Sequence, residues 1–317
     1  MNNALYQFIA LNPQSIERYE DWLKISPFLG QSHGNFIARL PKKWLSVLNE
    51  HIRDININGW GQEDAKKLLE FFCLLNIKNS IIPIGLNDFS IDDWSNSISN
   101  DIKKLKNILI IDKRNNNFNL PTFDNLNTNH LRISSSLESN KNLSKKYSLF
   151  SLLSPYLKYS GKVAFVDRNN YLVDSQGRET PFLLFISELL SNIKDSKCHE
   201  IVIYARFDHN NSFLNSEENI SKLMLNYFSK YMTPIYGIRY IFCNEVGTAN
   251  TDLHERKIVT NFCLFRMADS ISGQTKSHSI TRVQDENIIS RNIDLWLDNG
   301  HGMEVVLEYV FHNKILK

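Results

Sequence analysis

Apolar and polar positions alternate most regularly in the second half of the chain. Short apolar runs at 162–167, 201–207, 238–243, 258–265 and 305–311 have the length of buried strands, and stretches of helical periodicity cover 148–159, 180–193 and 218–231. Strands that alternate with helices of this length predict an α/β domain with a mostly parallel sheet flanked by helices.

The first half has a different pattern, in which helical spacing predominates. Apolar residues recur at helical intervals over 15–25, after Pro41 and over 62–75, where Ala65, Leu68, Leu69 and Phe72 form one stripe. The short apolar runs at 81–84 and 108–111 are predicted to be buried strands. We therefore expect a mainly helical N-terminal domain with a few strands.

A change in composition separates the two halves. Residues 115–142 are rich in Asn, Ser and Thr, which favour turns and leave little to bury. The predicted organisation is an N-terminal domain at 1–114, an Asn-rich linker or surface excursion at 115–144, and an α/β domain at 145–317. We expect the Asn-rich segment to be exposed and to be cut first by proteases.

The bulk properties narrow the class of protein. The 317 residues are 42% hydrophobic, which is enough for a sizeable core, and the net charge of +2 gives no general attraction to nucleic acid, although a local basic groove is compatible with it. No apolar run is long enough to span a membrane, and the first residues do not resemble a secretory signal. Cys73 and Cys263 lie in apolar contexts, which indicates buried, reduced thiols and a cytoplasmic location.

One segment carries most of the functional argument. His254 is followed by Arg256 two positions later and by Asn261 seven positions later, with the apolar run that begins at Ile258 between them. This spacing resembles the His-x-Lys-x-x-x-x-Asp motif of the phospholipase D superfamily, with Lys replaced by Arg and Asp by Asn. It is closer still to the divergent His-Asp-Arg-Tyr type of motif in the C-terminal domain of ESCRT-associated MIT proteins and related bacterial proteins. The resemblance covers about residues 145–317 and implies a phospholipase-D-like fold.

The resemblance also implies a chemistry. In active members the histidine attacks phosphorus and forms a phosphohistidine, the lysine holds the phosphate oxygens, the aspartate orients the ring, and a second motif supplies the acid. Here Arg256 can hold a phosphate bidentately, whereas Asn261 can accept a hydrogen bond but cannot balance an imidazolium charge. This chemistry requires no metal and no cofactor.

Two functions from different classes follow. We count one copy of the motif. His312 and Lys314 also have the His-x-Lys spacing, but about one such triplet is expected by chance in a chain with nine histidines and many lysines. The favoured function is a non-catalytic or weakly active module that binds a phosphate-bearing ligand, such as nucleic acid, or a protein partner. Related bacterial proteins suggest a role beside nucleic-acid-processing or antiviral defence machinery. The alternative is a metal-independent nuclease, a homodimer in which His254 meets its symmetry mate.

Four further residues are candidates for substrate binding. Asp167 follows a predicted strand, where it can enter a site or cap a turn. Lys257 either contributes to the site or is solvated on the other face of its strand. Ser270 and Ser272 lie where the related proteins place small polar residues after the motif strand. A structural ion pair is the competing interpretation for His254 and Arg256.

Overall fold

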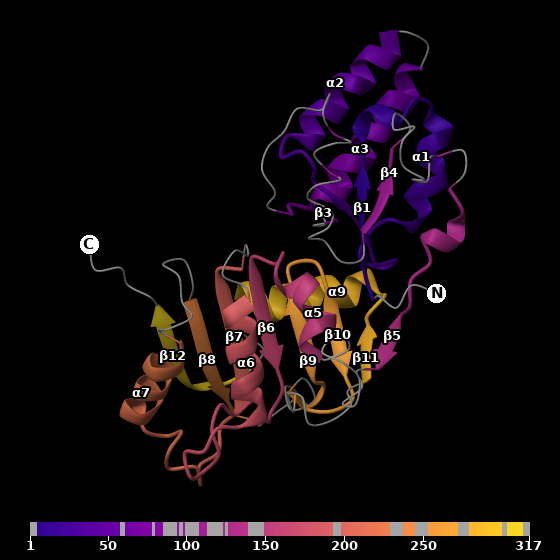
Figure 1. Ribbon diagram of the computed structural model, residues 1–317. Helices are drawn as coiled ribbons and strands as arrows, with labels where there is room; N and C mark the ends of the chain where they lie inside the picture. Colours follow the sequence, from indigo (N-terminus) through magenta and orange to yellow (C-terminus); the bar gives the residue numbers. More distant parts are fainter. Residues whose placement is uncertain are drawn as a thin grey trace, which may run out of the picture. The chain divides into compact units, whose positions relative to one another are not determined.

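The computed structural model of the protein describes residues 5–57, 61–77, 80–84, 94, 98, 108–112, 123, 126–138, 149–192, 198–228, 237–244, 253–271, 279–299 and 303–312. The chain divides into two compact units, Met1–Ser135 and Ser136–Lys317. Each unit has its own sheet with helices packed against it (Figure 1). The predicted α/β class is confirmed.

Unit 1 is built on a parallel sheet rather than on helices alone. Its strands are β1 (Gln7–Leu11), β2 (Asn35–Ala38), β3 (Ile81–Ile82) and β4 (Ile108–Ile111), in the order β3-β2-β1-β4. All three pairings are parallel. The prediction of a mainly helical N-terminal domain is therefore wrong. Strands β1 and β2 were missed because their apolar runs are short.

Helices whose bounds are fully described pack against this sheet. They are α1 (Tyr19–Ile25), α2 (Trp44–Ile57) and α3 (Gln62–Ile77), with the 3-10 turns η1 (Pro13–Ser15) and η2 (Ser26–Phe28) before and after α1. The ring centroid of Phe72, on α3, lies 4.3 Å from that of Trp22 and 5.2 Å from that of Trp44. Cys73, the next residue on α3, is exposed, so the expectation of a buried thiol fails there, whereas Cys263 is buried.

Unit 2 contains a mixed eight-stranded sheet. Its strands, in chain order, are β5 (Ser136–Glu138), β6 (Lys162–Val166), β7 (Glu200–Arg206), β8 (Gly237–Cys243), β9 (Lys257–Thr260), β10 (Leu264–Met267), β11 (Ser279–Arg282) and β12 (Val305–His312). The order is β12-β8-β7-β6-β9-β10-β11-β5. Among these strands, β6, β7 and β8 pair in parallel, and every other pairing is antiparallel. The sheet is therefore not mostly parallel.

The single strand predicted over 258–265 is a hairpin. The chain reverses between β9 and β10, where Cys263 N donates to the hydroxyl of Thr260 at 2.8 Å and Thr260 N donates to the Cys263 carbonyl at 2.9 Å. The hydroxyl thus satisfies a backbone group inside an apolar turn. As a result, the two halves of the run pair with each other, Leu264 opposite Val259.

Helices cover both faces of the unit 2 sheet (Figure 1). One face packs against α5 (Leu149–Leu157) and α6 (Pro181–Asn192), where Phe165 contacts Phe182 and Phe185. The other packs against α9 (Glu286–Ile293) and the π-helical segment η6 (Asp294–Asn299), where Tyr204 stacks edge-on against Trp296. A further helix, α7 (Glu217–Phe228), contacts β12.

The Asn-rich segment 115–144 falls largely outside the described residues. Of the residues that are described, Phe123 and Leu131 are buried in the core of unit 1, Thr128–His130 form the 3-10 turn η4, and β5 belongs to unit 2. The division between the units thus falls inside this segment. The predicted domain limits at 114 and 145 and the early proteolysis remain predictions. No helix within the described ranges is long and apolar enough to cross a membrane.

Candidate functional site

The register between β6 and β9 creates the candidate site. The two strands are antiparallel, with Val166 opposite Lys257, so the end of β6 lies beside the start of β9. Asp167 follows β6 and Arg256 precedes β9. The backbone joins these segments further, because Arg168 N donates to the Leu253 carbonyl at 3.2 Å. Three predicted site residues, His254, Arg256 and Asp167, are therefore brought to one edge of the sheet.

Arg256 is held in a defined orientation. Its Nε donates to the hydroxyl oxygen of Ser270 at 3.2 Å, and its Nη1 donates to the Ala268 carbonyl at 2.8 Å. Nε also lies 3.7 Å from Oδ2 of Asp167. The side chain nevertheless keeps 29% of its surface exposed. A guanidinium that is fixed on one side and open on the other can receive an anion without first being ordered.

Asp167 forms the floor of the site. Its side chain is 4% exposed, and Oδ1 accepts from Asn169 N at 3.0 Å. Oδ2 is buried and forms no hydrogen bond with any described residue. Burial raises the pKa of Asp167, while the Asn169 N–H, the Ser270 hydroxyl and the charges of Arg256 and Arg168 act in the opposite direction. Asp167 therefore lies beside Arg256 and also anchors the turn after β6.

His254 contacts a cation in this site. It is exposed and has helical backbone, like Leu253 before it, and its Nε2 is 3.4 Å from Nη1 of Arg168. Because a guanidinium can only donate, the ring nitrogen accepts in this contact. We call Arg168, His254 and Arg256 the basic cluster.

Two members of this site were not predicted from the sequence. Arg168 supplies a second guanidinium, and Asn169, which is exposed, donates from its side chain to Ser270 at 3.2 Å. The sequence signal that could have identified them is their position, because both closely follow the strand that ends at Val166. Ser270 was predicted and links Arg256 to Asn169.

Asn261 does not join the basic cluster. It lies in the turn between β9 and β10, where its Oδ1 accepts from Lys162 N at 2.8 Å. Lys162 begins β6, so Asn261 and His254 lie beyond opposite ends of β9, a strand about 13 Å long at the usual rise per residue. The backbone of Gly161 is close, because a Cβ built there would lie 3.3 Å from the Asn261 oxygen. In this structure Asn261 ties strand ends together and does not orient His254.

The other two candidates are also not placed in the site. Lys257 is buried, pairs with Glu255 at 3.2 Å and lies 5.9 Å from the Trp296 ring centroid, under the α9 and η6 face. Lys257 was expected either to contribute to the site or to be solvated on the opposite face of its strand. It lies on that opposite face but is buried there. Ser272 lies outside the described residues.

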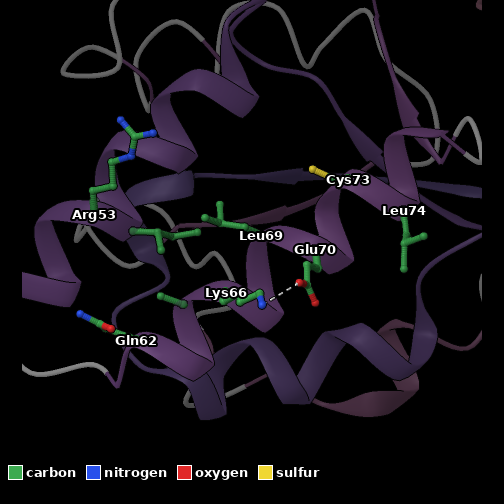
Figure 2. A pocket seen from close by; sticks show the side chains of 9 residues that line it. Arg53, Gln62, Lys66, Leu69, Glu70, Cys73 and Leu74 are labelled. Atoms are coloured by element: carbon green, nitrogen blue, oxygen red, sulfur yellow. Dashed lines mark ion pairs between the residues drawn. The ribbon is translucent and has the colours of Figure 1, made fainter.

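A hollow in unit 1 has a different character. It lies between α2 and α3, has a volume of about 710 Å³, and has an apolar floor that includes Ile52, Ala65 and Leu69. Figure 2 shows the ion pair on its rim, Lys66 with Glu70 at 3.8 Å. The hollow therefore offers apolar surface rather than a set of converging reactive groups. None of the predicted site residues lines it.

Within the described ranges, no group of three or more His, Cys, Asp or Glu side chains is arranged to hold a metal ion. The chain matches no protein-family model and no curated protein sequence.

Proposed function

We propose that unit 2 is a binding module that holds a phosphate-bearing ligand at the basic cluster without cleaving it. The observation that carries the proposal is the convergence of two guanidinium groups, Arg168 and Arg256, at one edge of the sheet. Arg256 is already ordered by Ser270 and Ala268, so little side-chain freedom is lost on binding. The carboxyl ends of parallel strands, here β6 and β7, are also where α/β sheets commonly bind ligands.

The contacts of His254 favour binding over catalysis. A nucleophilic histidine needs a free nitrogen lone pair directed at phosphorus. In this site Nε2 faces Arg168, and Asn261, which the resemblance to phospholipase D would make the orienting residue, lies at the far end of β9. We propose instead that the three members of the basic cluster share the oxygens of one phosphate. The resemblance adds the expectation that the module binds nucleic acid, another phosphate-bearing ligand or a protein partner.

The test is the affinity of the full chain for inorganic phosphate and for a short fluorescent single-stranded oligonucleotide. We expect Arg256→Ala to weaken binding of both by about tenfold or more, since charge-assisted bonds to phosphate are lost. Arg291→Ala is the matched control, because it removes an exposed arginine that lies on α9, away from the cluster. Equal affinity of wild type and Arg256→Ala, with both folded, would refute the proposal.

One observation favours the alternative of a metal-independent phosphodiesterase. His254 is exposed at the sheet edge, so a second copy of the chain could bring its own His254 to the same phosphate. That function requires a homodimer and cleavage of oligonucleotides in the presence of EDTA that His254→Ala abolishes. Light scattering that shows a monomer, or intact substrate after long incubation, would exclude it in favour of the binding module.

A further inference from the structure

Resting on the proposed function, we propose that Asp167 makes ligand binding at the basic cluster proton-linked. An anion held by Arg168 and Arg256 drives proton uptake by the Asp167 carboxyl, and the site therefore binds its ligand more tightly as the pH falls. Asp167 is thus a positioning and selecting residue beneath the site, which need not touch the ligand.

The first support is the incomplete pairing of the carboxylate. Oδ2 is buried without a hydrogen bond to any described residue, although Arg256 Nε lies only 3.7 Å away. The Arg256 donors Nε and Nη1 are directed to Ser270 and Ala268 instead. The attraction between Asp167 and Arg256 is therefore through space, and a competing anion can cancel it without breaking a direct hydrogen bond.

The second support is the set of charges around Asp167. Arg168 follows it in the chain, and Arg256 faces it from before β9, with His254 beyond Arg168. Neighbouring β7 faces it with the Tyr204 carbonyl, which accepts from Asp167 N at 3.5 Å, while the phenol of Tyr204 donates to the Trp296 carbonyl.

The remaining neighbours do not compete for this role. Ser270, from after β10, carries no charge, although its hydroxyl lowers the pKa of Asp167. Glu255, the nearest acid in sequence to Arg256, pairs with Lys257 at 3.2 Å and with Arg266 at 3.5 Å. The arginines of the basic cluster are therefore the charges that an anion would neutralise beside Asp167.

These groups set the direction of the linkage. Burial raises the pKa of Asp167, and the two arginines oppose that rise. An anion bound to the arginines removes their effect, so the carboxyl takes up a proton on binding. Linkage is reciprocal, and protonation must therefore strengthen anion binding by the same factor. A purely structural Asp167, which only anchors the turn through Asn169, would change stability but not the number of protons bound with the ligand.

The experiment uses sulfate, whose charge is constant over the pH range, beside inorganic phosphate. Calorimetric titration of the full chain from about pH 5.5 to 7.5, in buffers of different ionisation enthalpy, gives the affinity and the protons taken up. Every comparison is made in the His254→Gln background, which removes the imidazole of the basic cluster. We expect Asp167→Asn in that background to bind sulfate about fivefold more tightly at the upper end of the range and to lose the remaining pH dependence.

The outcomes separate the two proposals. The proton linkage alone is overturned if sulfate binding has the same pH dependence in the His254→Gln chain and in the chain that also carries Asp167→Asn. Failure of the wild-type chain to bind sulfate and phosphate would overturn the proposed function as well. If Asp167→Asn does not fold, carbon-13 NMR of the Asp167 carboxyl in the His254→Gln chain decides, since added sulfate must raise its titration midpoint. A midpoint that sulfate leaves unmoved would overturn the linkage.

Discussion

In both units a buried aspartate follows a parallel strand, but the hydrogen bonding of the two carboxylates differs. In unit 1, β1 and β4 are neighbours at the point where the strand order reverses, and Asn12 and Asp112 follow them. Asp112 Oδ1 accepts from Asn12 Nδ2 at 3.1 Å and from Ser15 Oγ at 3.2 Å, and all three residues are buried. In unit 2, Asp167 follows β6 and leaves Oδ2 without a hydrogen bond among the described residues.

The contrast lies in how far the polar groups of each cluster are bonded and buried. Both clusters lie where a ligand site is expected, because ligands bind in crevices beyond the carboxyl ends of parallel strands. The Asp112 cluster donates and accepts within itself, and none of these three residues is exposed, so it ties two strand ends together. The Asp167 cluster keeps two arginines and a histidine at the surface. Hydrogen-bond satisfaction and exposure, rather than position, therefore distinguish the two.

The largest effect expected from this comparison is in unit 1. Asp112→Ala leaves the buried Asn12 and Ser15 donors without this acceptor and should lower the free energy of unfolding by about 2–4 kcal/mol. Urea unfolding followed by tryptophan fluorescence measures it, since Trp22 and Trp44 lie in the unit 1 core. Glu70→Ala, which removes only an exposed ion pair, should cost less than about 0.5 kcal/mol. Equal costs would mean that the Asp112 cluster is not a structural tie.

The next effect concerns ligand binding in unit 2. Arg256→Lys keeps the charge but loses the planar fork that can bind phosphate bidentately, and we expect about a tenfold loss of phosphate affinity. The unfolding free energy should change by less than about 1 kcal/mol, because the side chain is partly exposed. Calorimetric titration with phosphate and urea unfolding test the two halves of this prediction. Unchanged affinity would make Arg256, like Asp112, a structural residue.

A smaller effect is expected at Asn261. Asn261→Ala removes the hydrogen bond to Lys162 N and should destabilise the chain by about 1 kcal/mol. Phosphate affinity should stay within about twofold of wild type, because the residue lies at the far end of β9. Parallel unfolding and binding measurements on the same preparation provide the comparison. A large loss of affinity without loss of stability would restore Asn261 to the site.

The smallest effect expected is the pH dependence that Asp167 gives to stability. Because burial raises its pKa in the folded state, the folded chain binds more protons than the unfolded chain. The contribution of Asp167 is therefore fully present below its ordinary pKa of about 3.9 and is lost as the pH rises through the raised value. Relative to wild type, Asp167→Asn should gain stability between acid and neutral pH. A constant difference in unfolding midpoint across that range would contradict this.

The sequence predicted the regular parts of unit 2 for a physical reason. Apolar runs of strand length, separated by amphipathic stretches, located β6, β7, β8 and β12. Thr180 before Pro181 marked the start of α6, where the Thr180 hydroxyl accepts from Leu183 N at 3.3 Å. The β9–β10 hairpin was not predicted, because its turn contains neither Gly nor Pro. Its Thr260 and Asn261 are too weak a turn signal to break an apolar run.

The site was predicted in part, and the missing part depends on sheet register. The local spacing was enough to identify His254 and Arg256 as candidates. Asp167 was identified by its position at the end of a predicted strand. Arg168 becomes a neighbour of His254 only because β6 and β9 pair antiparallel, and the same register carries Asn261 away from both. No local pattern encodes which strands pair over a separation of this length. The role of Asn261 could therefore not be read from its spacing.

The short strand β5 has a practical consequence for handling unit 2. It pairs with β11 through Ser136, Leu137 and Glu138 and so covers β11, leaving the shorter β5 as the edge strand. A fragment that begins at residue 145 lacks this cover and presents the free backbone groups of Ser279–Arg282 to other molecules. Exposed edges of this kind pair between chains and promote aggregation. A fragment that begins ahead of Ser136 keeps β11 paired and has only the short β5 at its edge. We expect it to remain monodisperse at concentrations where the shorter fragment precipitates.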